Sequence, residues 1–364
     1  MEYSYIPQFE PLLGNEEKEQ LCDCIDKNWI TGGKKVKEFE RRIAELCHVK
    51  HAISCSNGTM ALFMALDSLQ LPKGADVIVP DFTFIASANS VVLAGLNPVF
   101  CDVDIQTLNA TAETIKKLIT INTVAIMPVH IFGQAANMTE IMKLAKERDL
   151  LVVEDAAQGI GVSWQGKPVG SFGGINMMSF YADKTITTGE GGMLLTDDDN
   201  LAERSLILKH QGRTGRGFYH HKYIGYNFRM TDLQAGIGVA QLYKLPAIIR
   251  AKKKHEALYR KLLKGVDGIE LPFVDDRGIN VPFRHNIFVT NPKELSLYLN
   301  EQNIGSREFF YPLHLQPCYN IKADCPNAIW ASEHGLSLPS SANLEDKQIE
   351  YICDNIKKGI AVCV

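Results

Sequence analysis

The sequence predicts an α/β protein with a mostly parallel sheet in a large domain, followed by a smaller C-terminal α+β domain. Short apolar runs typical of buried strands recur through the first half of the chain, and most are separated by stretches with helical spacing of apolar residues. This alternation indicates βαβ units, whose parallel strands are covered by helices on both faces. The length of 364 residues is enough for one large and one smaller domain.

The expected elements are placed from the positions of their apolar residues. Helices are expected at 15–28 and 36–47, and in the second Val36, Phe39 and Ile43 recur at helical spacing. Buried strands are expected at 76–80, 98–103, 124–130, 150–154, 175–180 and 192–196. Helices are expected between them at 59–70, 84–95, 111–120 and 137–148. In such sheets ligands bind where the carboxyl ends of the strands meet the loops.

Beyond the last of these strands the pattern changes. Residues 209–230 are rich in Gly and Arg and predict a long irregular loop, which in compact domains is often functional. Two helices are expected next, at 232–243 and 247–264, with the three lysines at 252–254 on a solvated face. We place the domain boundary near residue 245, which gives a large domain 1–245 and a small domain 246–364.

The composition favours a soluble protein of a reducing compartment. The formal net charge is −4 and the pI is near 6.2, which does not suggest a nucleic-acid partner. The N-terminus lacks the features of a signal peptide, and no apolar run approaches the ~20 residues of a membrane span. The nine cysteines show no zinc-site spacing and are expected to be structural thiols, with no metal bound. We therefore expect a cytoplasmic protein with no membrane partner.

The first group of chemically suggestive residues surrounds Lys184. An expected strand ends at Ser179-Phe180, the lysine follows five residues after the serine, and Thr188-Gly189-Glu190-Gly191-Gly192 forms a glycine-rich turn. A lysine at a strand end can be desolvated there. Desolvation lowers the pKa of its amine, which can then act as the nucleophile that forms a Schiff base. Glycines permit close approach of the backbone to a planar ring. The alternative is a surface lysine in a loop.

The second group is Glu154-Asp155-Ala156-Ala157-Gln158, at the end of the strand expected at 150–154. A carboxylate in this place can keep a pyridine nitrogen protonated, so that the ring accepts electrons from a substrate carbon. The alternative is an aspartate that caps the N-terminus of a helix. Asp155 therefore predicts either a ring partner or a cap.

The third group is Ser56-Asn57-Gly58-Thr59, directly before an apolar helical stretch. Free backbone N–H groups and the helix dipole favour a phosphate at such a helix start. The alternative is an ordinary capped helix. A phosphate cradle, a ring-facing acid and a lysine, in this order along an α/β chain, resemble the arrangement in the fold-type I aminotransferases that use pyridoxal phosphate (PLP).

The amino-acid sequences of these segments resemble those of the DegT/DnrJ/EryC1/StrS family of PLP-dependent nucleotide-sugar aminotransferases. Besides the three groups, the resemblance rests on Thr83-Phe84-Ile85-Ala86-Ser87, Pro128-Val129-His130-Ile131-Phe132-Gly133-Gln134 and Gly225-Tyr226-Asn227-Phe228-Arg229-Met230. It runs from about residue 6 to the C-terminus and is densest over 50–245. The resemblance implies the PLP fold-type I, which is the fold of aspartate aminotransferase.

The resemblance also implies a role for each matching residue. Lys184 would hold PLP covalently and then move protons, and Asp155 would pair with the pyridine nitrogen. The remaining cofactor contacts would come from Gln158 at the phenolic oxygen, Phe84 stacked on the ring, and Gly58, Thr59 and Ser179 at the phosphate. Asn227 would reach the phosphate of the neighbouring subunit's cofactor, so that the active unit would be a homodimer with shared sites.

Substrate contacts are expected from the loop at 209–217 and from a segment near residue 310. Arg213 or Arg216 would clamp the diphosphate of the nucleotide. Arg307 and His314 would lie near the sugar. For each of these four residues the alternative is a solvated loop side chain.

One position departs from the family pattern. Asp183 directly precedes the lysine, where related enzymes often have a neutral side chain. Its carboxylate would either raise the pKa of Lys184 or turn to solvent. The lysine itself is intact, whereas a dehydrating branch of the family has histidine in its place. Lys184 therefore favours transamination.

The resemblance implies a two-step transamination with L-glutamate as the expected amino donor. The segments TITTGEGG and FYPLH look most like those of perosamine and viosamine synthases, which aminate carbon 4 of a nucleotide-linked 4-keto-6-deoxyhexose. Three alternatives stay open: a 3-keto sugar aminotransferase, a PLP-binding regulator without turnover, and a plain α/β protein without a cofactor. The sequence leaves the nucleotide and the sugar stereochemistry open.

Overall fold

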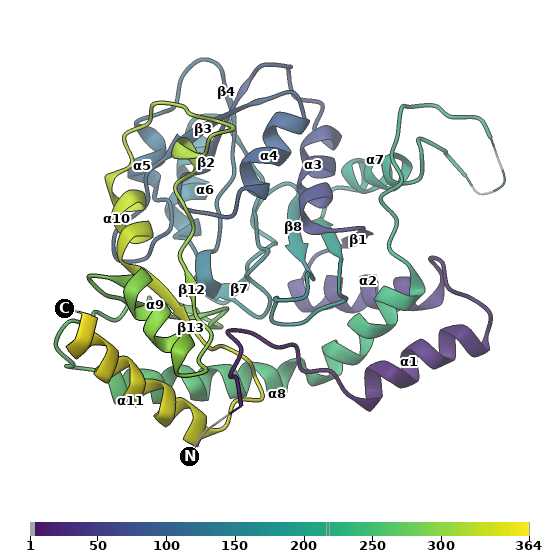
Figure 1. Cartoon of the computed structure of the whole chain (residues 1–364). Helices are drawn as coiled ribbons and strands as arrows, with labels where there is room; N and C mark the ends of the chain where they lie inside the picture. Colours follow the sequence, from purple (N-terminus) through teal and green to yellow (C-terminus); the bar gives the residue numbers. More distant parts are fainter. Residues whose placement is uncertain (1–3, 216, 218, 364) are drawn as a thin grey trace.

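A parallel sheet of four strands lies in the upper part of the molecule as drawn in Figure 1. The computed structural model describes residues 4–215, 217 and 219–363. The strands β2 (Asp76–Pro80), β3 (Asn97–Cys101), β4 (Thr123–Ile126) and β5 (Leu151–Val152) lie in the order β3-β2-β4-β5 and are all parallel. Each of them was predicted: β2 with its observed bounds, and the other three with bounds that differ by a few residues.

Three further strands continue this sheet. They are β1 (His51–Cys55), β8 (Asn176–Ser179) and β9 (Gly192–Thr196), in the order β1-β9-β8. A parallel bridge between Asp155 and Met177 joins β8 to the end of β5. Because β9 pairs with both neighbours in antiparallel fashion, it is the exception in a mostly parallel sheet. The predicted fold class is confirmed, although β1 was not predicted.

Helices cover both faces of the sheet, as a parallel sheet requires. On one face Val77 and Val79 pack in a core cluster with α3 (Gly58–Ser68) and α4 (Ala86–Leu93), whereas Ile78 belongs to the cluster with α2 (Lys34–Cys47) and α6 (Met138–Glu147). The remaining helices of this part are α1 (Asn15–Asp26), α5 (Ala112–Lys116) and α7 (Asp199–Lys209). The alternation of neighbouring β2 residues between two cores explains why the strand is apolar throughout.

A single long helix, α8 (Asp232–Leu263), replaces the two helices that the sequence predicts. It begins with a capping box between Thr231 and Gln234, and it continues through Pro246. The expected gap between residues 243 and 247 is wrong. Contacts with α1, α2 and α11 (Asp346–Cys363) support the helix on both sides of Pro246. The expected solvated face is wrong for Lys252, which is 1% exposed.

The C-terminal part is a small α+β unit. Its strands β11 (His285–Phe288), β13 (Gly335–Leu338) and β12 (Arg307–Glu308) form an antiparallel sheet in the order β11-β13-β12. The helices α9 (Pro292–Glu301) and α11 pack on it, and α10 (Pro326–His334) precedes β13. The predicted boundary at residue 245 falls inside α8, so we keep the division into two domains as a proposal with its junction along this helix.

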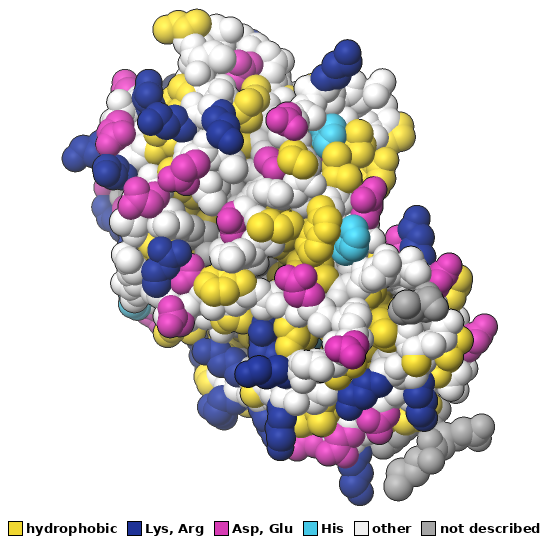
Figure 2. All heavy atoms as spheres, turned by 90° about the vertical axis from the view of Figure 1, so that its left-hand side faces the viewer, with side chains coloured by type: hydrophobic (Ala, Val, Ile, Leu, Met, Phe, Trp, Pro, Cys, Tyr) yellow, Lys and Arg dark blue, Asp and Glu magenta, His cyan; other side chains and the backbone are white. Residues whose placement is uncertain are grey.

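A third small sheet lies between the two parts of the chain. It contains β6 (Ser163–Trp164), β7 (Lys167–Pro168) and β10 (Gly278–Ile279), in the order β10-β6-β7. Figure 2 shows acidic and basic side chains interspersed over the face that it displays. Within the described residues, no helix combines the length and the apolar character that crossing a bilayer demands. The eight cysteines whose side chains are described are free thiols.

Candidate active site

Lys184 lies in the connection between β8 and β9, residues 180–191, which we call the lysine turn. The turn is held by hydrogen bonds from the Phe180 amide to the Gly191 carbonyl and from the Thr188 amide to the Phe180 carbonyl, both 2.9 Å. The Phe180 ring is fully buried against Phe39 of α2, with centroids 4.8 Å apart. The base of the turn is therefore anchored in the core, and the lysine is presented from a fixed support.

The amine of Lys184 lies in a mixed aromatic and charged environment. Its Nζ is 4.6 Å from the centroid of the Phe283 ring and 3.7 Å from Asp183 Oδ1. Burial lowers the pKa of Lys184, the charge of Arg284 lowers it further, and the carboxylates of Asp183 and Asp155 raise it in part. A buried amine with a lowered pKa is the state that a Schiff-base lysine needs.

Asp155 lies at the carboxyl end of β5 and is 6% exposed. Ser87 of α4 donates a hydrogen bond to its Oδ2 at 2.7 Å, and the Ala157 amide donates to its Oδ1 at 3.1 Å. No helix begins after Asp155, so the alternative of a helix cap is wrong. The charge of Asp155 raises the pKa of Lys184 in part, against the larger effect of burial.

The start of α3 lies against the lysine turn. Asn57 caps the helix by accepting a hydrogen bond from the Met60 amide at 2.9 Å. A Cβ added at Gly58 would lie 3.0 Å from the Ser179 Cβ and 3.1 Å from its Oγ, and one at Gly192 would lie 2.3 Å from the Asn57 carbonyl oxygen. The glycines therefore let the helix start approach Ser179 closely, and Thr59 follows as the next helical residue.

The other two expected cofactor residues differ in exposure. Gln158 is 5% exposed, and its Oε1 accepts a hydrogen bond from the Phe132 amide at 2.6 Å. The Phe84 ring is 58% exposed, with its centroid 6.4 Å from that of Phe310. A large aromatic ring with a free face is suited to stack on a flat heterocycle.

These features fit PLP. A buried amine, a fixed carboxylate and a helix start without a side chain at Gly58 match the aldehyde, the ring nitrogen and the phosphate of that cofactor. The glycine lets the helix start lie close to Ser179, because a Cβ there would press against that serine.

The Asp183 side chain turns into the protein. Of the two orientations that the sequence left open, toward Lys184 or toward solvent, the structure has the first. The Asp183 side chain is 16% exposed, and its Oδ2 is 3.2 Å from Arg284 Nη2 and 3.3 Å from Arg307 Nη1. Sequence reasoning missed Arg284, which is 7% exposed. No local motif marks this arginine, because its partner is 101 residues away in the chain.

The expected substrate residues are placed in different surroundings. Arg213 is half-buried, and its Nε lies 3.4 Å from the His210 carbonyl. Arg216 lies outside the described residues. Arg307 is exposed and pairs with Asp183, and Asn227 is exposed with its backbone bridged to His210.

His314 is buried, with 5% exposure, and is fixed by Asp81 at the carboxyl end of β2. The carboxylate accepts a hydrogen bond from the His314 amide at 2.8 Å and lies 2.7 Å from its Nδ1. Together with Cys325 these residues bring three possible metal ligands within 4.8 Å of one another. Burial raises the pKa of the Cys325 thiol, so a hydrogen-bonded Asp–His pair describes the group better than a metal centre.

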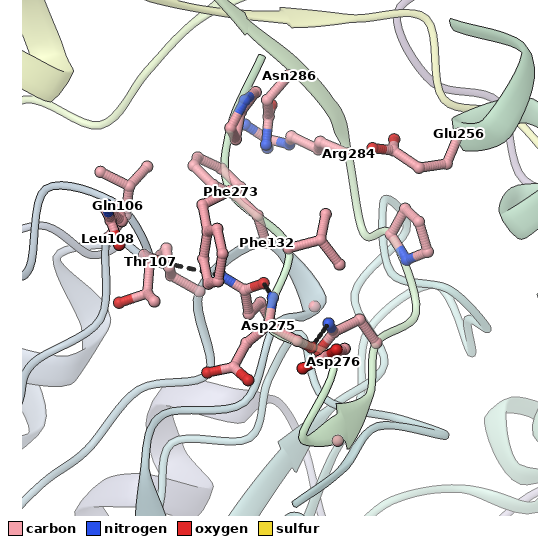
Figure 3. A pocket seen from close by; sticks show the side chains of 18 of the residues that line it. Gln106, Thr107, Leu108, Phe132, Glu256, Phe273, Asp275, Asp276, Arg284 and Asn286 are labelled. Atoms are coloured by element: carbon pink, nitrogen blue, oxygen red, sulfur yellow. Dashed lines mark hydrogen bonds between the residues drawn. The ribbon is translucent and has the colours of Figure 1, made fainter. Parts of the chain in front are cut away.

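A pocket of about 400 Å³ lies near the site (Figure 3). Its lining includes Phe132, Phe273, Asp275 and Arg284, and Figure 3 shows Arg284 beside Asn286 and Glu256. Lys184 and Asp155 do not line it. Arg284 lines this pocket and also pairs with Asp183 of the lysine turn, so one residue contacts both.

Comparison with known proteins assigns the site to a family. The profile of the DegT/DnrJ/EryC1/StrS aminotransferase family matches residues 11–357. The chain belongs to this family. It is 39% identical over 366 residues to a GDP-perosamine synthase of Vibrio cholerae, covering 97% of this chain and 98% of the relative.

Two further relatives agree with this assignment. A UDP-N-acetyl-3-dehydro-alpha-D-glucosamine 3-aminotransferase of Acidithiobacillus ferrooxidans is 36% identical, covering 92% of this chain and 91% of the relative. The solved structure of the aminotransferase TlmJ from Streptoalloteichus hindustanus superposes with a TM-score of 0.96 at 29% identity, covering 99% of this chain and 100% of that one. The predicted family, fold-type I, PLP cofactor and aminotransferase activity are confirmed.

Proposed function

We propose that this aminotransferase aminates a 4-keto-6-deoxyhexose carried on a nucleoside diphosphate, giving a 4-amino-4,6-dideoxy sugar of the perosamine or viosamine type. The observation that supports amino transfer is the lysine turn: burial lowers the pKa of the Lys184 amine, and the Asp155 carboxylate, which Ser87 fixes, acts on that pKa. The position of the keto group rests on likeness to the Vibrio cholerae GDP-perosamine synthase over nearly the whole chain. L-Glutamate is the proposed donor.

Each residue of the site has a defined task in this proposal. PLP supplies the electron-accepting ring when it is bound. Lys184 binds the cofactor and moves a proton at Nζ, and burial lowers the pKa of this amine, which favours the transfer. Asp155 keeps its negative charge at the ring nitrogen, where Ser87 orients it. Gly58, Thr59 and Ser179 hold the phosphate, Gln158 contacts the phenolic oxygen, and Phe84 stacks on the ring.

The substrate and assembly are further parts of the proposal. Arg213 and Arg216 clamp the diphosphate, and Arg307 and His314 line the sugar site. The protein works as a cytoplasmic homodimer in which Asn227 completes the partner's phosphate site. The exposed side chain of Asn227 supports this arrangement, because it is available to a second copy.

The experiment separates the two half-reactions. Purified protein is loaded with PLP and mixed with L-glutamate, and the change of the visible absorbance is followed in a single turnover. The aminated protein is then given GDP-, UDP- or dTDP-linked 4-keto-6-deoxyhexose, and the product is identified by mass spectrometry and NMR. We expect a 4-amino sugar from at least one nucleotide, whereas a protein that forms no amino sugar from any of them contradicts the proposal.

A 3-keto sugar is the second candidate acceptor, since the Acidithiobacillus ferrooxidans relative is named as a 3-aminotransferase. A parallel panel of 3-keto nucleotide sugars decides between the two positions. A regulator without turnover would bind PLP but leave its absorbance unchanged on addition of glutamate. The first half-reaction therefore also separates an enzyme from a PLP-binding regulator.

A further inference from the structure

The carboxylate of Asp183 is held by two arginines from the C-terminal part of the chain. Arg284 directly precedes β11, and Arg307 begins β12. Both reach the same oxygen, Oδ2, at 3.2 Å and 3.3 Å. Two charged donors on one oxygen leave the carboxylate little freedom to rotate, since rotation would break both ion pairs.

The second oxygen of Asp183 is directed at the reactive amine. Oδ1 is buried and has no hydrogen-bond partner among the described residues, and it lies 3.7 Å from Lys184 Nζ. A buried carboxylate oxygen without a hydrogen-bond partner lowers the stability of the fold. The position of Oδ1 near the Lys184 amine therefore calls for a functional explanation. The lysine amine is the partner that it meets when Nζ moves by a few tenths of an ångström.

The charges around Lys184 act in opposite directions. Burial lowers the pKa of the lysine most strongly, and Arg284 lowers it further. Asp183 raises this pKa through its charge. Without Asp183, the amine would face the positive charge of Arg284 with less compensation, and its protonated form would be harder to reach.

We propose that Asp183 is a positioning residue that acts through Lys184: clamped by Arg284 and Arg307, it holds Oδ1 against Nζ and stabilises the amine each time it takes up a proton. In that step Nζ gains the proton from the substrate carbon, and the carbon keeps the electron pair. This inference rests on the proposed function of Lys184. A lysine stabilised in its protonated form is a stronger base for this transfer.

The rival explanation is that Asp183 only neutralises the buried Arg284. Both explanations predict a loss of stability when the carboxylate is removed, so stability does not separate them. The proton affinity at Nζ separates them when Arg284 is absent. In an R284Q background, loss of a carboxylate that only neutralised Arg284 would leave the pKa at Nζ unchanged, whereas loss of a carboxylate held against Nζ would still lower it. The test must therefore read protonation at residue 184.

The experiment titrates the PLP-loaded protein without any substrate. The visible absorbance is recorded against pH for the wild type, D183N and D183N/R284Q. The amide introduced by D183N keeps the shape of the side chain and an oxygen for the arginines, so folding is retained. We expect the pKa read from the absorbance to fall by about one unit in D183N, the lower end for a lost opposite charge at this distance.

The double variant is the matched control. D183N/R284Q is compared with R284Q, titrated in the same way: if Oδ1 acts directly on Nζ, loss of Asp183 should lower the pKa in this background too, and equal pKa values in the two variants overturn the proposal. The rate of the glutamate half-reaction near neutral pH should fall about ten-fold in D183N and recover in part in D183N/R284Q. An unchanged pKa in D183N, with or without a lower unfolding temperature, overturns the proposal.

A second measurement keeps the inference separate from the proposed function. In the apoprotein, labelling of Lys184 by an amine-reactive reagent is measured against pH by mass spectrometry. The D183N variant should reach half-maximal labelling at a lower pH than the wild type. This readout needs neither PLP nor a sugar, so failure of the sugar reaction leaves it intact, and identical labelling curves overturn the role of Asp183.

Discussion

Ser87 donates a hydrogen bond of 2.7 Å to Asp155 across 68 residues of sequence. The serine lies in the first turn of α4 and is fully buried, and Thr83 Oγ1 is 3.3 Å from its hydroxyl. The segment 83–87 thus carries the exposed ring of Phe84 on one side and the anchor of the carboxylate on the other. In the proposed function, this short stretch of chain would supply both the stacking ring and the anchor of the carboxylate.

The first prediction concerns this anchor. We expect S87A to weaken PLP binding and to slow the glutamate half-reaction by about ten-fold, since a hydrogen bond to a charged group is lost. Asp155 keeps the bond from the Ala157 amide, so D155A should be far more damaging. The PLP dissociation constant and the single-turnover rate measure both effects.

The matched control for S87A is S90A. Ser90 is equally buried, and its hydroxyl donates a bond of the same 2.7 Å length to the Ser87 carbonyl, without touching Asp155. Equal losses of PLP affinity in S87A and S90A would show that packing of α4, and not orientation of the carboxylate, explains the effect.

The second prediction concerns space at the phosphate cradle. In G58A the new methyl group would lie 3.0 Å from Ser179 Cβ, so that the serine must shift. We expect PLP affinity to fall about ten-fold, in line with the cost of mild overpacking. G174A is the control, because a Cβ at Gly174 has no neighbour within 4 Å. A G58A variant with wild-type PLP affinity would count against a phosphate at this helix start.

Local motifs carried most of the sequence-based interpretation. Lys184, Asp155 and Gly58 each lie in a contiguous segment at the end of a strand or the start of a helix, and the structure brings these segments to one side of the sheet. No single segment of the sequence predicts the order of the strands. However, the carboxyl ends of parallel strands all lie at the same edge of the sheet. The three residues could therefore be grouped before the fold was seen.

The residues that sequence reasoning missed are defined by distant partners. Ser87, Arg284 and Asp81 gain their importance from contacts across 68, 101 and 233 residues. Each is an ordinary polar residue in its own segment. The merging of two expected helices into α8 has the same origin, because packing against α1, α2 and α11 overrides the local preference of Pro246 for a helix end.

The third prediction tests the shared active site. K184A and N227A chains are co-expressed with different tags, and the doubly tagged species is purified. If Asn227 serves the partner's cofactor, each mixed dimer contains one site with both residues intact, and about half of the wild-type activity per dimer should return. Each variant alone should be strongly impaired.

The control for this experiment pairs K184A with D155A. Both residues belong to the same chain's site in our proposal, so a mixed dimer has no intact site and should stay inactive. Activity in the K184A/D155A dimer, or its absence in the K184A/N227A dimer, would contradict a site completed by Asn227 of the partner subunit.

The fourth prediction concerns stability and pH at Lys252. Its Nζ donates to the carbonyls of Phe283 and Ser340, at 3.3 Å and 2.8 Å. Burial, with a smaller effect of Arg284, lowers the pKa of Lys252 to about 7 from its ordinary value of 10.5. Between these values the unfolded chain binds a proton that the folded chain does not, so this group makes the protein more stable as the pH rises.

The K252M variant should lack this contribution. The wild-type free energy of unfolding should gain up to about 1.4 kcal/mol per pH unit relative to K252M above pH ~7. Near pH ~7 the free energy of unfolding of K252M should be highest relative to the wild type, because the variant has no amine to bury. Toward pH ~10 the loss of its two hydrogen bonds should make K252M the less stable protein. Urea unfolding of both proteins over this range gives the difference, and the exposed K253M serves as control. Parallel curves for K252M and the wild type would mean that Lys252 does not change its charge on folding.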